Sequence, residues 1–221
     1  MTDQQLLIGQ SDPIEAIYQS HEPGVLAYIT AVEGPSYRPL GADMAFLADG
    51  SRVGTLSSGC IESDLAVHAE RAVSSEKPVV VRYGKGSPYF DIQLPCGGGL
   101  EVTLIPKPER SILAELQKMR SNRVPATLNI QRKSGAISIK SEGALETSEE
   151  YFQVQYEPQI QFLVFGKGPE AASLSALVQA TGYPNSLYSP DEETRASAHA
   201  SGITTFDLRP DAFPNDVNID P

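Results

Sequence analysis

One segment constrains the fold more than any other: an apolar run over residues 159–165 leads through Gly166, Lys167 and Gly168 into a helical pattern over residues 170–181. A second apolar run follows over residues 184–188. Strand, glycine turn, helix and strand in this order form a βαβ unit, which requires a parallel sheet with its helix on one face. A polar helix near residues 192–200 and a strand near 203–206 continue the pattern with fewer strands than a doubly wound domain normally has. We therefore expect a truncated Rossmann-like domain over residues 158–221.

The first 157 residues carry antiparallel signals. The apolar run over residues 24–32 predicts a buried strand, and Asp49 and Gly50 between the short runs 44–47 and 52–56 predict a tight hairpin. Helical spacing begins at Ile61 and stops before Pro78. Further strands are expected over the segments 79–82, 90–94 and 100–105. These patterns predict a mixed α+β domain with a largely antiparallel sheet, which makes the whole chain an α/β protein.

The middle of the chain shows no chemically distinctive motif. Residues 111–120 suit a short helix, and the segments 126–130, 136–139 and 152–156 suit strands. We expect this stretch to extend the sheet of the first domain or to bridge to the second. The predicted domains are therefore residues 1–157 and 158–221.

Charge and composition exclude several classes of function. The formal net charge of the 221-residue chain is −11, and clustered Lys and Arg for a nucleic acid or an anionic membrane are missing. No run of eighteen apolar residues exists, and residues 1–10 lack the features of a secretion signal, so a cytoplasmic location is expected. Two cysteines, Cys60 and Cys96, cannot form a disulfide framework or a four-cysteine zinc site.

The densest group of chemically useful residues begins in the loop from Gly34 to Gly41, where two prolines bracket Ser36 and Arg38. Proline restricts the backbone, and a planar guanidinium offers forked donors that match phosphate or carboxylate oxygens. We therefore interpret this loop as an anion clamp.

A second group surrounds Cys60, which is preceded by Ser57, Ser58 and Gly59 and followed by Glu62. The start of a helix favours a thiolate and bound anions, so a reactive or metal-ligating role for Cys60 is one interpretation. A tight turn with a serine helix cap is the other. Residue chemistry alone leaves both open.

Cys96, Gly97 and Gly98 form a third group, which fits either a special backbone path or a glycine-rich loop with an incidental cysteine. Gly166 and Gly168 approximate a dinucleotide-binding turn. Position 171 is Ala where a further glycine would stand, and no acidic residue ends the following strand. Binding of NAD or NADP is therefore doubtful.

The segments GPSYRPLGADM, DGSRVGTLSSGCIE and PCGGGLEV, followed by a Rossmann-like half, resemble the XdhC/CoxI family in order and spacing. These are accessory proteins in the maturation of xanthine and carbon monoxide dehydrogenases. The family's first motif falls on Ser36, Arg38, Pro39 and Gly41. Its cysteine motif falls on residues 57–62, with Ser58 where a glycine is usual. Its Cys-Gly-Gly motif falls on residues 96–98.

The resemblance implies a chaperone that binds molybdenum cofactor (molybdopterin) transiently, assists its sulfuration with a cysteine desulfurase, and delivers it to a molybdenum hydroxylase apoenzyme. Cys60 is then the expected contact to the metal. No catalytic residue of the chain's own is expected, and a homodimer stays open. The competing hypotheses are an NAD(P)-dependent oxidoreductase that uses Gly166 and Gly168, and a family member that retains the fold only as an interaction module.

Overall fold

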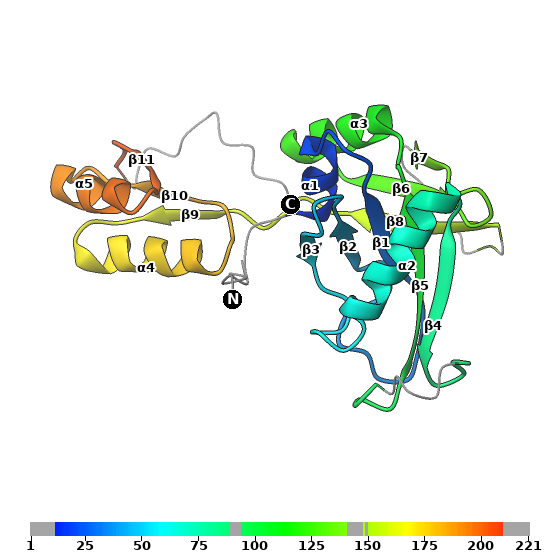
Figure 1. Ribbon diagram of the computed structural model, residues 1–221. Coiled ribbons are helices and arrows are strands. Elements are labelled where there is room, and N and C mark those ends of the chain that lie inside the picture. Colours follow the sequence, from blue (N-terminus) through cyan, green and yellow to red (C-terminus); the bar gives the residue numbers. More distant parts are fainter. Residues whose placement is uncertain (1–11, 89–93, 141–147, 149, 210–221) are drawn as a thin grey trace. The chain divides into compact units, whose positions relative to one another are not determined.

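The computed structural model describes residues 12–88, 94–140, 148 and 150–209, which form two compact units (Figure 1). The larger unit ends at Glu157 and the smaller begins at Pro158. The predicted fold class is confirmed, because the larger unit is a mixed α and β structure with an antiparallel sheet and the smaller has a parallel one.

The larger unit is built on a five-stranded antiparallel sheet with the order β3-β2-β1-β5-β4. Its strands are β1 (Val25–Glu33), β2 (Asp43–Phe46), β3 (Arg52–Gly54), β4 (Val79–Gly84) and β5 (Gly99–Pro106). The hairpin between β2 and β3 is confirmed, with Gly50 in the left-handed region at φ +84°. Of the strand expected over residues 90–94, positions 90–93 lie outside the described residues, and Leu94 is not in a strand.

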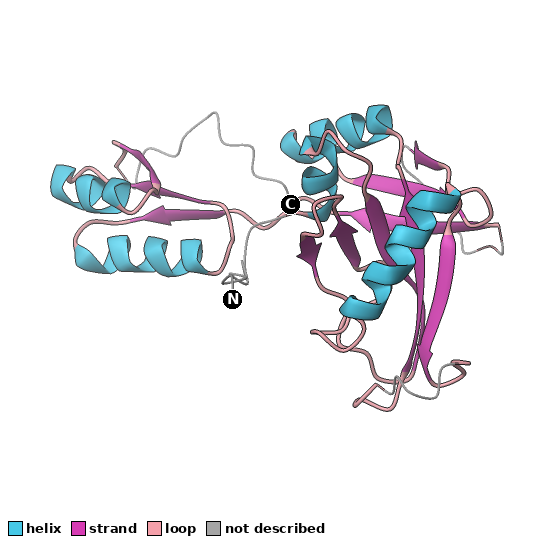
Figure 2. Cartoon of the chain, viewed as in Figure 1, coloured by secondary structure: helices cyan, strands magenta, loops and turns pink. Residues whose placement is uncertain are grey.

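Helix α2 (Glu62–Ser75) covers one face of this sheet (Figure 2). It buries Leu65, Ala69 and Ala72, which recur at helical spacing, against strand side chains. Alternate residues of β1 serve the two faces: Ala27 belongs to the core under α2, and Tyr28 belongs to the core on the opposite face. This double burial explains why β1 is apolar from Val25 to Ile29.

The middle of the chain corrects one expectation. Strands β6 (Ala126–Gln131), β7 (Ile137–Lys140) and β8 (Tyr151–Tyr156) form their own antiparallel sheet, in the order β7-β6-β8, and do not extend the first sheet. Their alternating apolar side chains pack with α3 (Arg110–Ser121) and with α1 (Pro13–Gln19) against the second face of the first sheet. Helix α1 was not predicted from the sequence, although the Asp12 carboxylate caps it by accepting from Glu15 N and Pro13 begins it.

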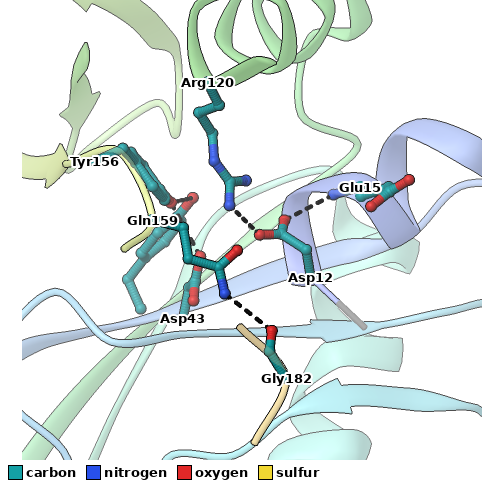
Figure 3. A network of polar contacts seen from close by, with 8 residues as sticks. Asp12, Glu15, Asp43, Arg120, Tyr156, Gln159 and Gly182 are labelled. Atoms are coloured by element: carbon teal, nitrogen blue, oxygen red, sulfur yellow. Dashed lines mark hydrogen bonds and ion pairs between the residues drawn. The ribbon is translucent and has the colours of Figure 1, made fainter. Parts of the chain in front are cut away.

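A buried polar network joins these two layers (Figure 3). The Tyr156 hydroxyl donates to Asp43 Oδ2 at 3.0 Å and lies 3.1 Å from the Tyr28 hydroxyl. Arg120 of α3 pairs with Asp12 and stacks over the Tyr156 ring at 5.5 Å. Burial raises the pKa of the Asp43 carboxyl to about 6, against the lowering effect of the Tyr156 hydrogen bond.

The smaller unit contains the βαβ pattern that the sequence predicts. Its elements are β9 (Phe162–Phe165), α4 (Pro169–Ala180), β10 (Asn185–Tyr188), α5 (Glu192–Ala200) and β11 (Thr204–Phe206). The three strands are parallel in the order β11-β10-β9. Their last residues, Phe165, Tyr188 and Phe206, stack as a ladder with ring centroids 4.8 and 4.9 Å apart. Within the described residues, every helix is too short or too polar to span a bilayer.

Candidate functional site

Three of the loops singled out in the sequence leave the same edge of the five-stranded sheet (Figure 1). β1 ends at Glu33, opposite the start of β5 at Gly99, and β4 ends at Gly84, also opposite Gly99. β3 ends at Gly54, beside the start of β2. Because neighbouring strands alternate in direction, the loops 34–42 and 55–61 begin at this edge, as do residues 85–88 after β4, and residues 94–98 lead back to it before β5. We call this region the loop edge.

Two of these loops are in direct contact through a buried glycine. A Cβ added at Gly98 would lie only 2.0 Å from the carbonyl oxygen of Pro35, and one added at Gly34 would lie 3.6 Å from the Gly98 Cα. The Gly98 carbonyl also accepts a hydrogen bond from Lys85 N at 3.0 Å. The approach of the Arg38 loop to the Cys96 loop therefore requires a residue without a side chain at position 98.

The Arg38 loop presents its side chains outward. The Ser36 hydroxyl donates to the Arg38 carbonyl at 2.6 Å, so this hydroxyl shapes the turn. Tyr37 and Leu40 are 63% and 56% exposed, and Arg38 is exposed as well. Among the described residues, the Arg38 guanidinium has no ion-pair or hydrogen-bond partner, which leaves its fork of donors available to an anion.

The loop that carries Cys60 is organised around the buried carboxylate of Glu62, which is 7% exposed. Oε1 accepts from the Thr55 hydroxyl at 2.7 Å, Leu56 N at 3.0 Å and Ser57 N at 2.8 Å. Oε2 accepts from the Ser57 hydroxyl at 2.5 Å, Gly59 N at 3.0 Å and Ile61 N at 3.1 Å. Burial alone would raise the pKa of Glu62, but hydrogen bonds, led by those from Ser57, lower it to about 2. The group is thus an internal anion inside the loop.

This arrangement changes how the predicted site residues are used. Ser57 and Gly59 direct their N–H groups inward to Glu62. Ser58 N donates to the Thr55 hydroxyl, and Ser58 holds a left-handed backbone with φ +61°. The outer face of the loop carries the exposed Cys60, two residues before helix α2 begins.

The third loop has a similar exposed thiol. Cys96 is free and exposed, and Gly97 beside it has φ +73° with nothing within 4 Å of an added Cβ. Gly59, beside Cys60, has the same open surroundings at φ +101°. No three His, Cys, Asp or Glu side chains of the described residues gather into a metal-holding group.

Gly166 and Gly168 belong to the smaller unit. Gly168 has φ +84°, and its N–H donates to the Thr194 hydroxyl at 2.7 Å. Asp191, the nearest acidic residue after β10, caps helix α5 by accepting from Thr194 N at 2.8 Å. The glycine turn is present as predicted. The Gly168 N–H and the Asp191 carboxylate, which could bind a dinucleotide, are hydrogen-bonded to Thr194 instead.

Thr55 was not predicted as a site residue, although its hydroxyl both donates to Glu62 Oε1 and accepts from Ser58 N. Thr55 does not stand out in the sequence, because small hydroxyl residues are common in turns of many kinds.

Comparison with known proteins bears on the same loops. The family model of the XdhC and CoxI family matches residues 17–84, which include the loops of Arg38 and Cys60. The molybdenum cofactor insertion chaperone PaoD of Escherichia coli (strain K12) is 30% identical over 176 residues, or 79% of this chain. The chain belongs to the XdhC and CoxI family. It spans about half the length of PaoD, of which 55% is covered.

Two further proteins are similar to this chain over different lengths. A probable xanthine dehydrogenase subunit of Bacillus subtilis (strain 168) is 46% identical over 52 residues, which are 24% of this chain and 16% of that protein. A crystal structure described as a xanthine dehydrogenase from Bacillus halodurans matches with a TM-score of 0.77 over 94% of this chain and 70% of the other. At 23% identity, that likeness supports the fold.

Proposed function

We propose that this chain is a chaperone that binds molybdenum cofactor and inserts it into a molybdenum hydroxylase. The observation that carries the proposal is the loop edge: an exposed thiol at Cys60 and an uncommitted guanidinium at Arg38 lie on loops from the same edge of one sheet. Molybdopterin is an anionic phosphate ester whose metal has affinity for thiolates. The Arg38 loop is suited to bind the phosphate group, and the Cys60 loop is suited to contact the metal.

In this proposal the two contacts have different roles. Arg38 binds the phosphate group as a forked donor, and Cys60 contacts the molybdenum from the outer face of its loop. The N–H groups of residues 56, 57, 59 and 61 do not bind the phosphate, because they donate to Glu62. Cys96, on the third loop, lies within the same edge and is the second candidate thiol.

Retention of molybdopterin by purified variants tests the proposal. Cys60→Ala is expected to lose the bound cofactor, and Cys96→Ala measures separately what the second candidate thiol contributes. Arg38→Gln is expected to weaken binding about 10- to 100-fold, since a charge-assisted hydrogen bond contributes about 1.5–3 kcal/mol. Arg71→Gln, which removes an exposed arginine on α2, is the control for net charge. Full retention by Cys60→Ala would remove Cys60 from the site.

Sulfuration of the cofactor with a cysteine desulfurase is the finer part of the proposal. Incubation of the chain with a desulfurase and cysteine is expected to leave a persulfide on Cys60, detectable by mass spectrometry of the peptide that contains it. Transfer to the hydroxylase is measured as activity gained by the apoenzyme when the loaded chain is added. A loaded chain that activates the apoenzyme no better than free cofactor would count against insertion.

The oxidoreductase hypothesis has less support, because Gly168 N and Asp191 are engaged by Thr194. Millimolar NAD or NADP is expected to leave the melting temperature unchanged, whereas a bound dinucleotide would raise it.

A further inference from the structure

The Cys60 loop is packed into the core at its two ends, where Leu56 and Ile61 are fully buried. Residues 55–61 belong to no helix or strand, and two consecutive residues, Ser58 and Gly59, have positive φ values of 61° and 101°. Ser58, Gly59 and Cys60 are exposed, and a Cβ added at Gly59 would have nothing within 4 Å. The middle of the loop is therefore held by polar contacts on its inner side.

The Glu62 carboxylate supplies that inner support. Its six hydrogen bonds come from five residues of the stretch that precedes it, and together they enclose both oxygens. All six groups are donors, so only an ionised carboxylate can accept from all of them. A glutamine would turn an NH2 group toward half of these donors and leave them unpaired in a buried place.

We propose that Glu62 is a positioning residue: its ionised carboxylate fixes residues 55–61 in the conformation that presents Cys60 outward, and it acts on bound cofactor only through this loop. Its side chain faces inward and its acceptor capacity is filled, so it does not itself contact the cofactor. The Glu62 carboxylate thus occupies the backbone N–H groups of the loop, which would otherwise be able to bind a phosphate.

The part of this inference that concerns cofactor rests on the proposed function, whereas the part that concerns the loop does not. Amide hydrogen exchange of residues 55–61 measures the loop alone. In Glu62→Gln we expect these amides to exchange at least about 10-fold faster, while the strands and the later turns of α2 stay protected. Glu70→Gln, an exposed glutamate on the same helix, is the matched control.

Should Glu62→Gln fail to fold, Ser57→Ala, which removes two of the loop's hydrogen bonds, gives a milder form of the same loss.

Cofactor retention completes the test. Glu62→Gln should lose molybdopterin to the same extent as Cys60→Ala, and Glu62→Asp, which keeps the charge but has a shorter reach, should be intermediate. Unchanged exchange in Glu62→Gln would overturn the proposal. So would a loosened loop that retains cofactor as the unmodified chain does, provided that Cys60→Ala loses it. If Cys60→Ala also retains cofactor, the proposed function fails at Cys60, and the exchange data still decide the support of the loop.

Discussion

Substitution of Gly98 by alanine should separate two loops of the proposed site. The new Cβ would stand 2.0 Å from the Pro35 carbonyl oxygen, whereas ordinary contact begins at 3.4 Å, so the backbones must part by about 1.4 Å. The obstacle is backbone on both sides and cannot rotate away. Overpacking of this kind costs about 1–3 kcal/mol, and the Lys85 hydrogen bond to the Gly98 carbonyl adds about 1 kcal/mol if it breaks. We expect a loss of about 2–4 kcal/mol in the free energy of unfolding.

Gly97→Ala is the matched control, because its Cβ would enter open space and only the positive φ of 73° opposes it. Its expected cost is about 1 kcal/mol. Urea denaturation of both variants measures the difference, with the slope of the transition checked for change. Molybdopterin retention of Gly98→Ala should also fall, since the Arg38 loop is displaced. Equal stability of the two variants would show that Gly98 does not maintain the contact between the loops.

Two further predictions concern backbone strain and pH. Ser58→Gly should raise the free energy of unfolding by about 0.5–1 kcal/mol, because the left-handed backbone at φ +61° costs serine more than glycine; thermal unfolding measures this, and a lower melting temperature would contradict it. The pKa of Asp43 is raised to about 6 from 3.8, so the folded state favours the protonated carboxyl. The contribution of the protonated Asp43 carboxyl to the free energy of unfolding is fully present below about pH 4 and is lost as the pH rises through about 6. Asp43→Asn should therefore flatten the decline in stability between pH 4.5 and 7 by about 1–3 kcal/mol, and an unchanged slope in urea titrations would count against the assignment.

Some residues of the candidate site can be recognised from the sequence, whereas the role of others depends on how the chain folds. The glycines and the two cysteines stand out in the sequence, because few other residues suit tight turns or offer a thiol. The role of Glu62 does not stand out: an acidic residue in the first turn of a helix is favourable to the helix dipole in any protein. Burial and six hydrogen bonds distinguish it, and both depend on how residues 55–61 fold back.

Elements whose signals are local can be predicted from the amino-acid sequence alone. Alternation, helical spacing, the turn at Asp49 and Gly50, and the glycine turn before α4 each lie within a short window, so backbone geometry and side-chain type fix them directly. The formation of a second sheet by β6, β7 and β8 depends on the tertiary structure, because their alternating pattern requires an apolar surface to pack against without specifying which one. The tertiary structure also brings Gly98 against Pro35, a contact between residues 63 positions apart that no local preference encodes.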